Sequence, residues 1–110
     1  MIKLFSAVAL SLFSLHASAI ELPADKAAYQ GDWRGEQMRL HIKQNGKVHY
    51  HRKTAEKKVD VSIDLDSFEG HSFLAGVGLF KTRFDVSKPP HKVGDKMKMV
   101  VDGVELTKVD

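Results

Sequence analysis

The chain of 110 residues contains no cysteine. It therefore has no disulfide to stabilise its fold, no thiolate nucleophile and no cysteine ligands for zinc or an iron–sulfur cluster. It also lacks any long stretch of helical periodicity. A small domain without cross-links depends on its apolar core alone, which favours a compact, closed β-sheet.

The sequence motifs of the common enzyme classes are absent as well. There is no Gly-x-Ser-x-Gly elbow, no Gly-rich phosphate loop, no dinucleotide fingerprint and no His-Glu-x-x-His helix. Asp60, Asp64 and Asp66 occupy alternate positions of one predicted strand and face water, where a raised carboxyl pKa suited to acid–base catalysis is not expected. We therefore predict that the protein is not an enzyme.

Charge of neither sign dominates, because 17 Lys and Arg face 14 Asp and Glu and are interspersed with them. This balance gives no reason to expect a nucleic-acid partner. One local cluster is basic, and it consists of Arg52, Lys53, Lys57 and Lys58. The cluster is either a contact site for an anionic lipid or glycan or the solvated end of a hairpin.

The N-terminus has the three parts of a secretory signal peptide. Lys3 gives a basic start, residues 7–15 an apolar stretch, and residues 17–19 a small-x-small cleavage site. The apolar stretch is about half of the ~20 residues that span a bilayer, so it is too short for a transmembrane anchor. We predict that residues 1–19 are cleaved off, leaving residues 20–110 as a single β-barrel domain. The mature protein is expected to be periplasmic or secreted, monomeric and not membrane-spanning.

Apolar and polar residues alternate over residues 38–42 and again after the Asn-Gly pair at 45–46, which is typical of a β-hairpin. A two-residue loop would put polar side chains on the apolar face. A three-residue loop with Gly46 in the left-handed conformation instead pairs Ile42 with Val48. Because a slip of one residue reverses every side chain, this longer loop is predicted.

The rest of the chain shows the same alternation of apolar and polar residues, interrupted by turns. Residues 59–66 form a third predicted strand, and residues 73–86 form one long or two short strands. Two consecutive prolines make residues 88–91 a predicted loop, whereas a tight type I′ turn at 102–103 joins the last two strands. A short helical turn is possible at residues 24–29. The chain is thus predicted to be all-β, a small antiparallel meander barrel of six to eight short strands.

Gly31, Asp32 and Trp33, just before the first strand, resemble the Gly-x-Trp signature of lipocalins and other calycin barrels. The resemblance implies a lipocalin-like barrel in which Trp33 closes one end and a basic residue of the last strand packs over it. Lys108 points inward in the predicted register and could take that position. The chain also resembles short exported bacterial proteins with a similar C-terminal hairpin, a likeness that implies no particular activity.

Three histidines form a candidate metal site. The predicted register puts His41 opposite His49, with His51 two residues further on, and all three point away from the apolar face. Imidazoles from neighbouring strands can converge on zinc or copper. The alternative is an exposed polar face whose rings merely pair across strands. No other cofactor is expected.

A second set of residues could form a surface for a ligand or a partner. It combines aromatic side chains with the proline segment and consists of Trp33, Phe68, Phe73, Pro89, Pro90 and His91. In a barrel this small, the interior can be filled entirely by its own side chains. The function we expect is an exported, non-catalytic binding module for an apolar small molecule or an envelope protein. The alternative is a periplasmic metal-binding protein that uses the histidine cluster.

Overall fold

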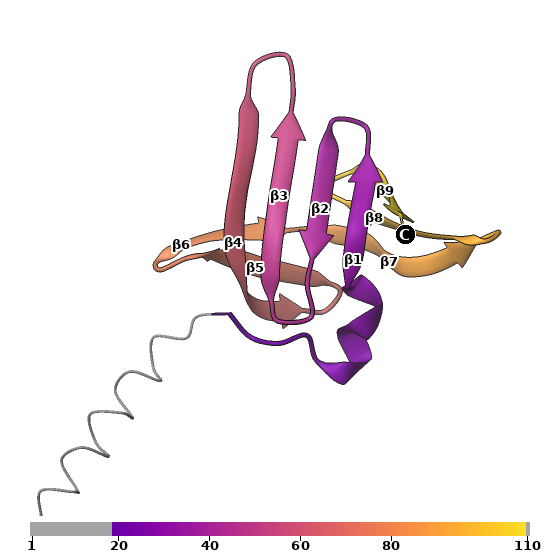
Figure 1. Cartoon of the computed structure of the whole chain (residues 1–110), viewed down its shortest axis with the longest axis horizontal. Coiled ribbons are helices and arrows are strands. Elements are labelled where there is room, and N and C mark those ends of the chain that lie inside the picture. Colours follow the sequence, from indigo (N-terminus) through magenta and orange to yellow (C-terminus); the bar gives the residue numbers. More distant parts are fainter. Residues whose placement is uncertain (1–18, 110) are drawn as a thin grey trace, which may run out of the picture.

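The computed structural model describes residues 19–109, so the predicted signal peptide lies almost entirely outside the described residues. A 3₁₀ helix, η1 (Ala24–Tyr29), precedes nine antiparallel strands (Figure 1). The strands are β1 (Gly31–Gly35), β2 (Met38–Ile42), β3 (Lys47–Lys53), β4 (Lys58–Glu69), β5 (Ser72–Val77), β6 (Phe80–Phe84), β7 (Val86–Val93), β8 (Lys96–Val101) and β9 (Val104–Val109). None of the helices in this part of the chain is long and apolar enough to cross a membrane.

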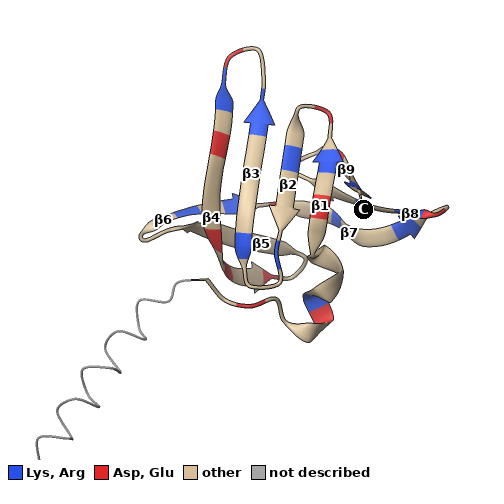
Figure 2. Cartoon of the chain, viewed as in Figure 1, with Lys and Arg blue, Asp and Glu red and all other residues tan. Residues whose placement is uncertain are grey.

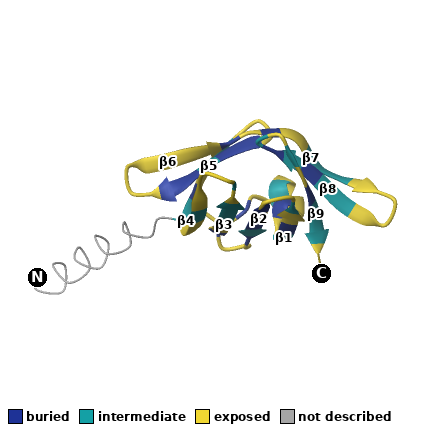
Figure 3. Cartoon of the chain, turned by 90° about the horizontal axis from the view of Figure 1, so that it is seen from above, coloured by how far each residue is buried: buried dark blue, intermediate teal, exposed yellow. Residues whose placement is uncertain are grey.

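All nine strands belong to one sheet with the order β6-β5-β4-β3-β2-β1-β9-β8-β7. The sheet curls into a half-barrel, and in Figure 3 the β5–β6 and β7–β8 hairpins cross over β1–β4. Its two edges are β6 and β7, although Asp85 alone separates them in the sequence. The predicted all-β antiparallel class is confirmed. The predicted closed barrel of six to eight strands is corrected to an open half-barrel of nine.

The predicted loop at residues 88–91 is wrong, because these residues belong to strand β7. Proline cannot donate a ladder hydrogen bond, which excludes it from a central strand but not from an edge strand. β7 is such an edge, and its pairing with β8 is irregular between Val86 and Lys88 and again between Lys88 and His91. The prolines therefore disturb the strand without ending it.

The predicted hairpin registers are confirmed. Ile42 pairs with Val48 across β2 and β3, and Gly46 has a φ of +88°. An ideal Cβ on Gly46 would also lie only 1.9 Å from the carbonyl oxygen of Ile20, so glycine is needed there for space as well as for conformation. In the last hairpin, Val101 pairs with Val104 across a two-residue turn.

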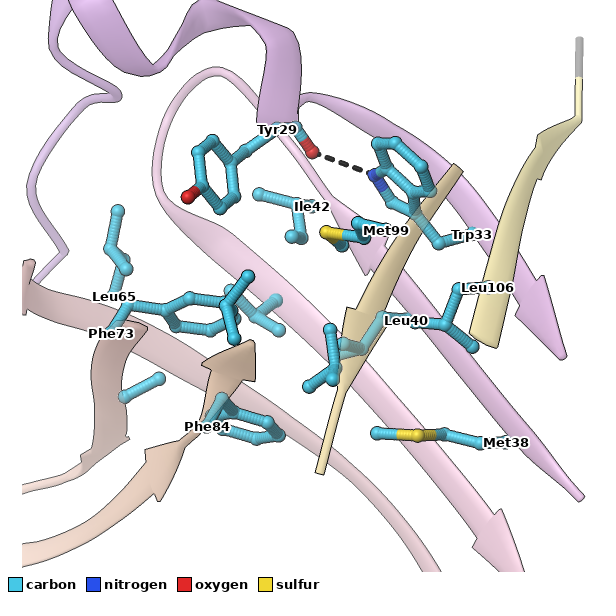
Figure 4. Packing of buried hydrophobic residues seen from close by; sticks show 14 of the residues in the cluster. Tyr29, Trp33, Met38, Leu40, Ile42, Leu65, Phe73, Phe84, Met99 and Leu106 are labelled. Carbon is cyan, nitrogen blue, oxygen red and sulfur yellow. Dashed lines mark hydrogen bonds between the residues drawn. The ribbon is translucent and has the colours of Figure 1, made fainter. Parts of the chain in front are cut away.

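The core lies between β1–β4 and the strands that cross them (Figure 4). Trp33 is completely buried, and its Nε1 donates a hydrogen bond to the Tyr29 carbonyl oxygen at 2.8 Å. Lys108 Nζ lies 5.0 Å from the centroid of the Trp33 ring and donates to the carbonyl oxygen of Ala28 at 3.1 Å. Together these contacts hold η1 against one end of the sheet. This geometry is compatible with a lipocalin-like fold.

Candidate functional site

The six residues predicted as a ligand or partner surface lie in different surroundings. Trp33 and Phe73 are core residues and completely buried. Phe68 is half-buried, and its ring packs edge-on to Tyr29 at a centroid distance of 5.2 Å. The remaining three, Pro89, Pro90 and His91, lie on edge strand β7. Of these six, Phe68 and Phe73 are in contact, with 5.8 Å between their ring centroids. This contact belongs to the core, against which Phe68 packs from its edge, and it does not form an exposed surface.

The inner face of β3 and β4 offers a different surface. Figure 1 shows that this hairpin extends well beyond the strands that cross its other half. Inner-face residues there are less covered, and Val61 is 41% exposed. A cavity of about 270 Å³ occurs at this open end of the half-barrel, lined by Tyr50, Arg52, Thr54, Lys57 and Val59.

Arg52 lies at the centre of this open end. It pairs with Met38 on one side and Val59 on the other, so its side chain shares the inner face with apolar neighbours. It also lines a neighbouring cavity of about 490 Å³, together with Glu36, Gln37, Gly103, Val104 and Glu105. The sequence grouped Arg52 with Lys53, but alternation along β3 puts these two side chains on opposite faces.

The predicted histidine cluster lies on the outer face of the same sheet. Strand pairing produces two adjacent rows across β1–β4, the first with Asp32, His41, His49 and Ser62, the second with Arg34, Arg39, His51 and Asp60. A cavity of about 270 Å³ lies over them and is lined by Arg39, His41, His49, His51 and Asp60. The structure thus brings the three histidines to one surface, as predicted.

Asp60 lines this cavity, although neither Asp60 nor Arg39 was predicted as part of the site. Its Oδ1 lies 2.6 Å from His49 Nε2, and its Oδ2 lies 3.8 Å from His51 Nδ1. The hydrogen bond from His49 lowers the pKa of Asp60 below its ordinary value. Asp60 was assigned to a solvated acidic face, and only the pairing of β3 with β4 reveals its histidine neighbours.

A second carboxylate, Asp32, anchors the arginines of this face. Arg39 donates to both of its oxygens, from Nε at 3.1 Å and from Nη2 at 2.9 Å, and Arg34 Nη2 donates at 3.1 Å. Partial burial raises the pKa of Asp32, but the hydrogen bonds from the two arginines outweigh burial and leave this pKa lowered.

No set of three or more His, Cys, Asp or Glu side chains within residues 19–109 is arranged to hold a metal ion. Here His49 is engaged by Asp60, and Arg39 lines the same cavity. Metal binding by His41, His49 and His51 stays a prediction.

The turn between β5 and β6 exposes large apolar side chains. Leu79 is 96% and Phe80 is 86% exposed, and Val77 is also exposed. Gly76 allows this tight hairpin, since an ideal Cβ at its position would lie 1.8 Å from the Phe80 carbonyl oxygen. Exposed apolar groups gathered in one place commonly mark an interaction surface.

Comparison with known proteins finds no match to this chain among protein-family models, curated proteins or solved structures. The lipocalin resemblance is therefore a compatibility of architecture, carried by the half-barrel and by the contact between Trp33 and Lys108.

Proposed function

We propose that this protein is an exported, non-catalytic binding module whose ligand is an elongated apolar molecule with an anionic group. The observation that carries the proposal is the open end of the half-barrel. There Tyr50, Arg52 and Val59 line a cavity on an inner face that the crossing strands leave uncovered. Apolar walls with a few polar groups are typical of small-molecule sites.

The apolar part of the ligand would lie against β3 and β4. The Tyr50 ring packs edge-on against Phe84 at 5.1 Å, which fixes the floor of the cavity to the core. Val59 and Val61 continue this wall toward the end of the hairpin. The deeper interior is filled by the protein's own side chains, such as Leu40 and Met99, so the ligand binds at the open end.

Arg52 would bind the anionic group. Its guanidinium forms no ion pair with any other side chain of residues 19–109, so its donors are available. A guanidinium can bind a carboxylate or a phosphate with two parallel hydrogen bonds. Lys57 lines the same cavity and adds a second positive charge. Arg52 also borders the neighbouring cavity, which provides room for the rest of an elongated ligand.

The test compares two neighbouring residues on opposite faces of β3. Titration calorimetry with laurate and with dodecanol should show binding of both to the exported protein, with laurate binding more tightly. Arg52→Gln should weaken laurate binding about tenfold to a hundredfold, because it removes hydrogen bonds between charged groups. It should change dodecanol binding little. Lys53→Gln, the matched control on the outer face, should leave both affinities unchanged. Absence of laurate binding to the unaltered protein at millimolar concentration would contradict the proposal.

A second candidate function, recognition of an envelope protein, is favoured by the exposed β5–β6 turn. A convex apolar tip such as Leu79 and Phe80 fits an apolar pocket on a partner. A photoreactive cross-linker introduced at Leu79 should give one discrete adduct in envelope extract, and Phe80→Ser should abolish it. The same cross-linker at Val93, in the β7–β8 hairpin, is the control. Equal adducts from both positions would contradict this role.

A further inference from the structure

Strand β6 is an exposed and regular edge of the sheet. Its buried residue is Phe84, and its exposed residues are Phe80, Lys81, Thr82 and Arg83. β6 pairs with β5 over its whole length without a bulge, and with no other strand of residues 19–109. Figure 2 shows it as the outer strand of the β5–β6 hairpin. An edge strand with this regular geometry can serve as a template for a further strand.

Two residues of β6 direct their backbone groups toward the free side. Val77 and Phe80 flank a two-residue turn in which Gly78 has a φ of +60°, as in a type II′ turn. The residues that flank such a turn are joined by a hydrogen bond, and hydrogen-bonded pairs then alternate along the hairpin. The N–H and C=O groups of Phe80 therefore point toward β5. Those of Lys81 and Arg83 point away from it, where residues 19–109 contribute no further strand.

The other edge of the sheet, β7, is protected against such pairing. Pro89 and Pro90 have no N–H group to donate, and the pairing of β7 with β8 shifts twice. Prolines and bulges are common means by which edge strands avoid further pairing. β6 has neither, so the two edges of one sheet differ in their capacity to accept a strand.

The cations of β6 are held by carboxylates of their own sheet. Lys81 Nζ lies 3.1 Å from Asp66 Oδ1 and donates to the Gly78 carbonyl oxygen at 3.0 Å, and Arg83 binds the carboxylate of Glu69. Because these charges are already balanced, the outer side of β6 gives no preference for an acidic partner. Two β6 strands paired over their full length would place Lys81 of each copy opposite Arg83 of the other. Like charges directly opposite are destabilising, which argues against a second copy of this chain as the occupant.

The inner side of β6 is apolar. Strand alternation puts Phe80 on the same side as Phe84, and the cross-strand neighbour of Phe80 is Val77, which is exposed as well. Phe84 packs against Tyr50, which lines the cavity at the open end of the half-barrel. A strand added beside β6 would place every second side chain along these apolar groups. β-branched apolar residues suit such positions.

We infer that β6 accepts an extended strand from a protein partner, with apolar residues on the inner side and uncharged polar residues on the outer side. Hydrogen bonds to the backbone of Lys81 and Arg83 hold the strand, and apolar side chains beside Phe80 set its register. This inference rests on the second candidate function, because it names what an envelope protein would contribute to the β5–β6 hairpin. It does not depend on laurate binding.

The test uses the exported protein and a short synthetic peptide that alternates valine and threonine, with a soluble tail and a fluorophore. Fluorescence anisotropy should show saturable binding. Amide hydrogen exchange followed by NMR should slow at Lys81 and Arg83 when the peptide binds, because their N–H groups become hydrogen-bonded. The amide of Phe80, which is already bonded to β5, should change little. The control peptide has proline in place of each valine and should not bind, because proline cannot extend a ladder.

Two variants at one residue separate the backbone from the charge. Lys81→Pro removes the outward N–H group but no hydrogen bond to β5, so the protein should stay folded and bind the peptide about tenfold more weakly or worse. Lys81→Gln, the matched control, retains the N–H group and should bind the peptide like the unaltered protein. Circular dichroism checks that both are folded. If Lys81→Pro does not fold, amide exchange in the unaltered protein still decides.

Several results would overturn the inference. One is peptide binding that leaves exchange at Lys81 and Arg83 unchanged, which would place the peptide elsewhere. Another is equal weakening by Lys81→Pro and Lys81→Gln, which would show that the charge matters and the backbone does not. A dimer of the unaltered protein that Lys81→Pro dissociates would make a second copy the occupant.

The strand and the second candidate function can fail separately. No binding of the peptide at millimolar concentration, together with a discrete adduct from the cross-linker at Leu79, would contradict the added strand and retain recognition by the tip of the hairpin. Peptide binding with slowed exchange at Lys81, but without that adduct, would support the added strand and contradict the role of the tip.

Discussion

The indole of Trp33 is completely buried. Its Nε1 donates a hydrogen bond to Tyr29 in η1, and its ring faces the Lys108 ammonium group of β9. Trp33→Ala should lower the free energy of unfolding by roughly 3–5 kcal/mol, because it leaves a large cavity in the core. Lys108→Met should cost less, about 0.5–2 kcal/mol, since it removes a cation from the ring face but retains an apolar stem. Urea denaturation followed by circular dichroism measures both. A larger loss for Lys108→Met would contradict this account of the end of the sheet.

Asp32 gives a pH-dependent contribution to stability. Its pKa is lower in the folded state than the ~3.9 of an unfolded chain, so the unfolded state binds more protons as the pH falls. The stabilisation is therefore fully present above about pH 4 and is lost as the pH falls through the folded-state pKa. Asp32→Asn should lower the melting temperature at pH 7, and the difference from the unaltered protein should shrink toward pH 3. Asp95→Asn, in the exposed β7–β8 turn, is the control and should show no such convergence.

Single residues differ in how well the sequence predicts them. Gly46, Trp33 and Lys108 were identified because each belongs to a local pattern, a turn or a short motif with a known spatial role. Arg52 was grouped with its neighbours in sequence, although alternation over residues 47–53 already places it on the inner face. Asp60 was beyond prediction, since its histidine contacts depend on the register between β3 and β4, which no turn sequence fixes.

At the scale of elements, two hairpins were predicted to the residue, whereas the expectation that Gly31, Asp32 and Trp33 precede the first strand is wrong, because these residues lie in β1. The β2–β3 and β8–β9 registers follow from one condition, that apolar side chains share a face. Strand β7 was missed because the same proline that forbids a central strand is tolerated at an edge. Whether a strand lies at an edge depends on the whole sheet. The sequence of residues 86–93 alone therefore cannot decide between a loop and a strand.

At the scale of the whole molecule, the strand order follows the chain except for one closure. β1 pairs with β9, which joins the two ends of the described chain, and the sheet opens between β6 and β7. Gly35 permits the closure, since a Cβ there would lie 2.5 Å from the carbonyl oxygen of Glu105. A meander pattern predicts which strands are neighbours in the sheet. It does not predict which two consecutive strands are left unpaired and become the edges of the sheet. The opening, and with it the two sheet edges, was therefore not predictable from periodicity.

Ile20, the residue that follows the predicted cleavage site, takes part in the backbone hydrogen bonds of the fold. Ile20 N donates to the Leu65 carbonyl oxygen at 3.2 Å, and Leu22 N donates to Gln44 O at 3.0 Å. A cut after Ala19 would turn the Ile20 nitrogen into an amino terminus, which still donates to Leu65. We therefore expect intact-mass analysis of the exported protein to give a chain that begins at Ile20. Ala19→Leu should block processing, because the cleavage site requires a small residue there, whereas Ala24→Leu, in η1, should leave it unchanged. An exported chain that still begins at Met1 would contradict this prediction and, with it, the identification of residues 1–19 as a signal peptide.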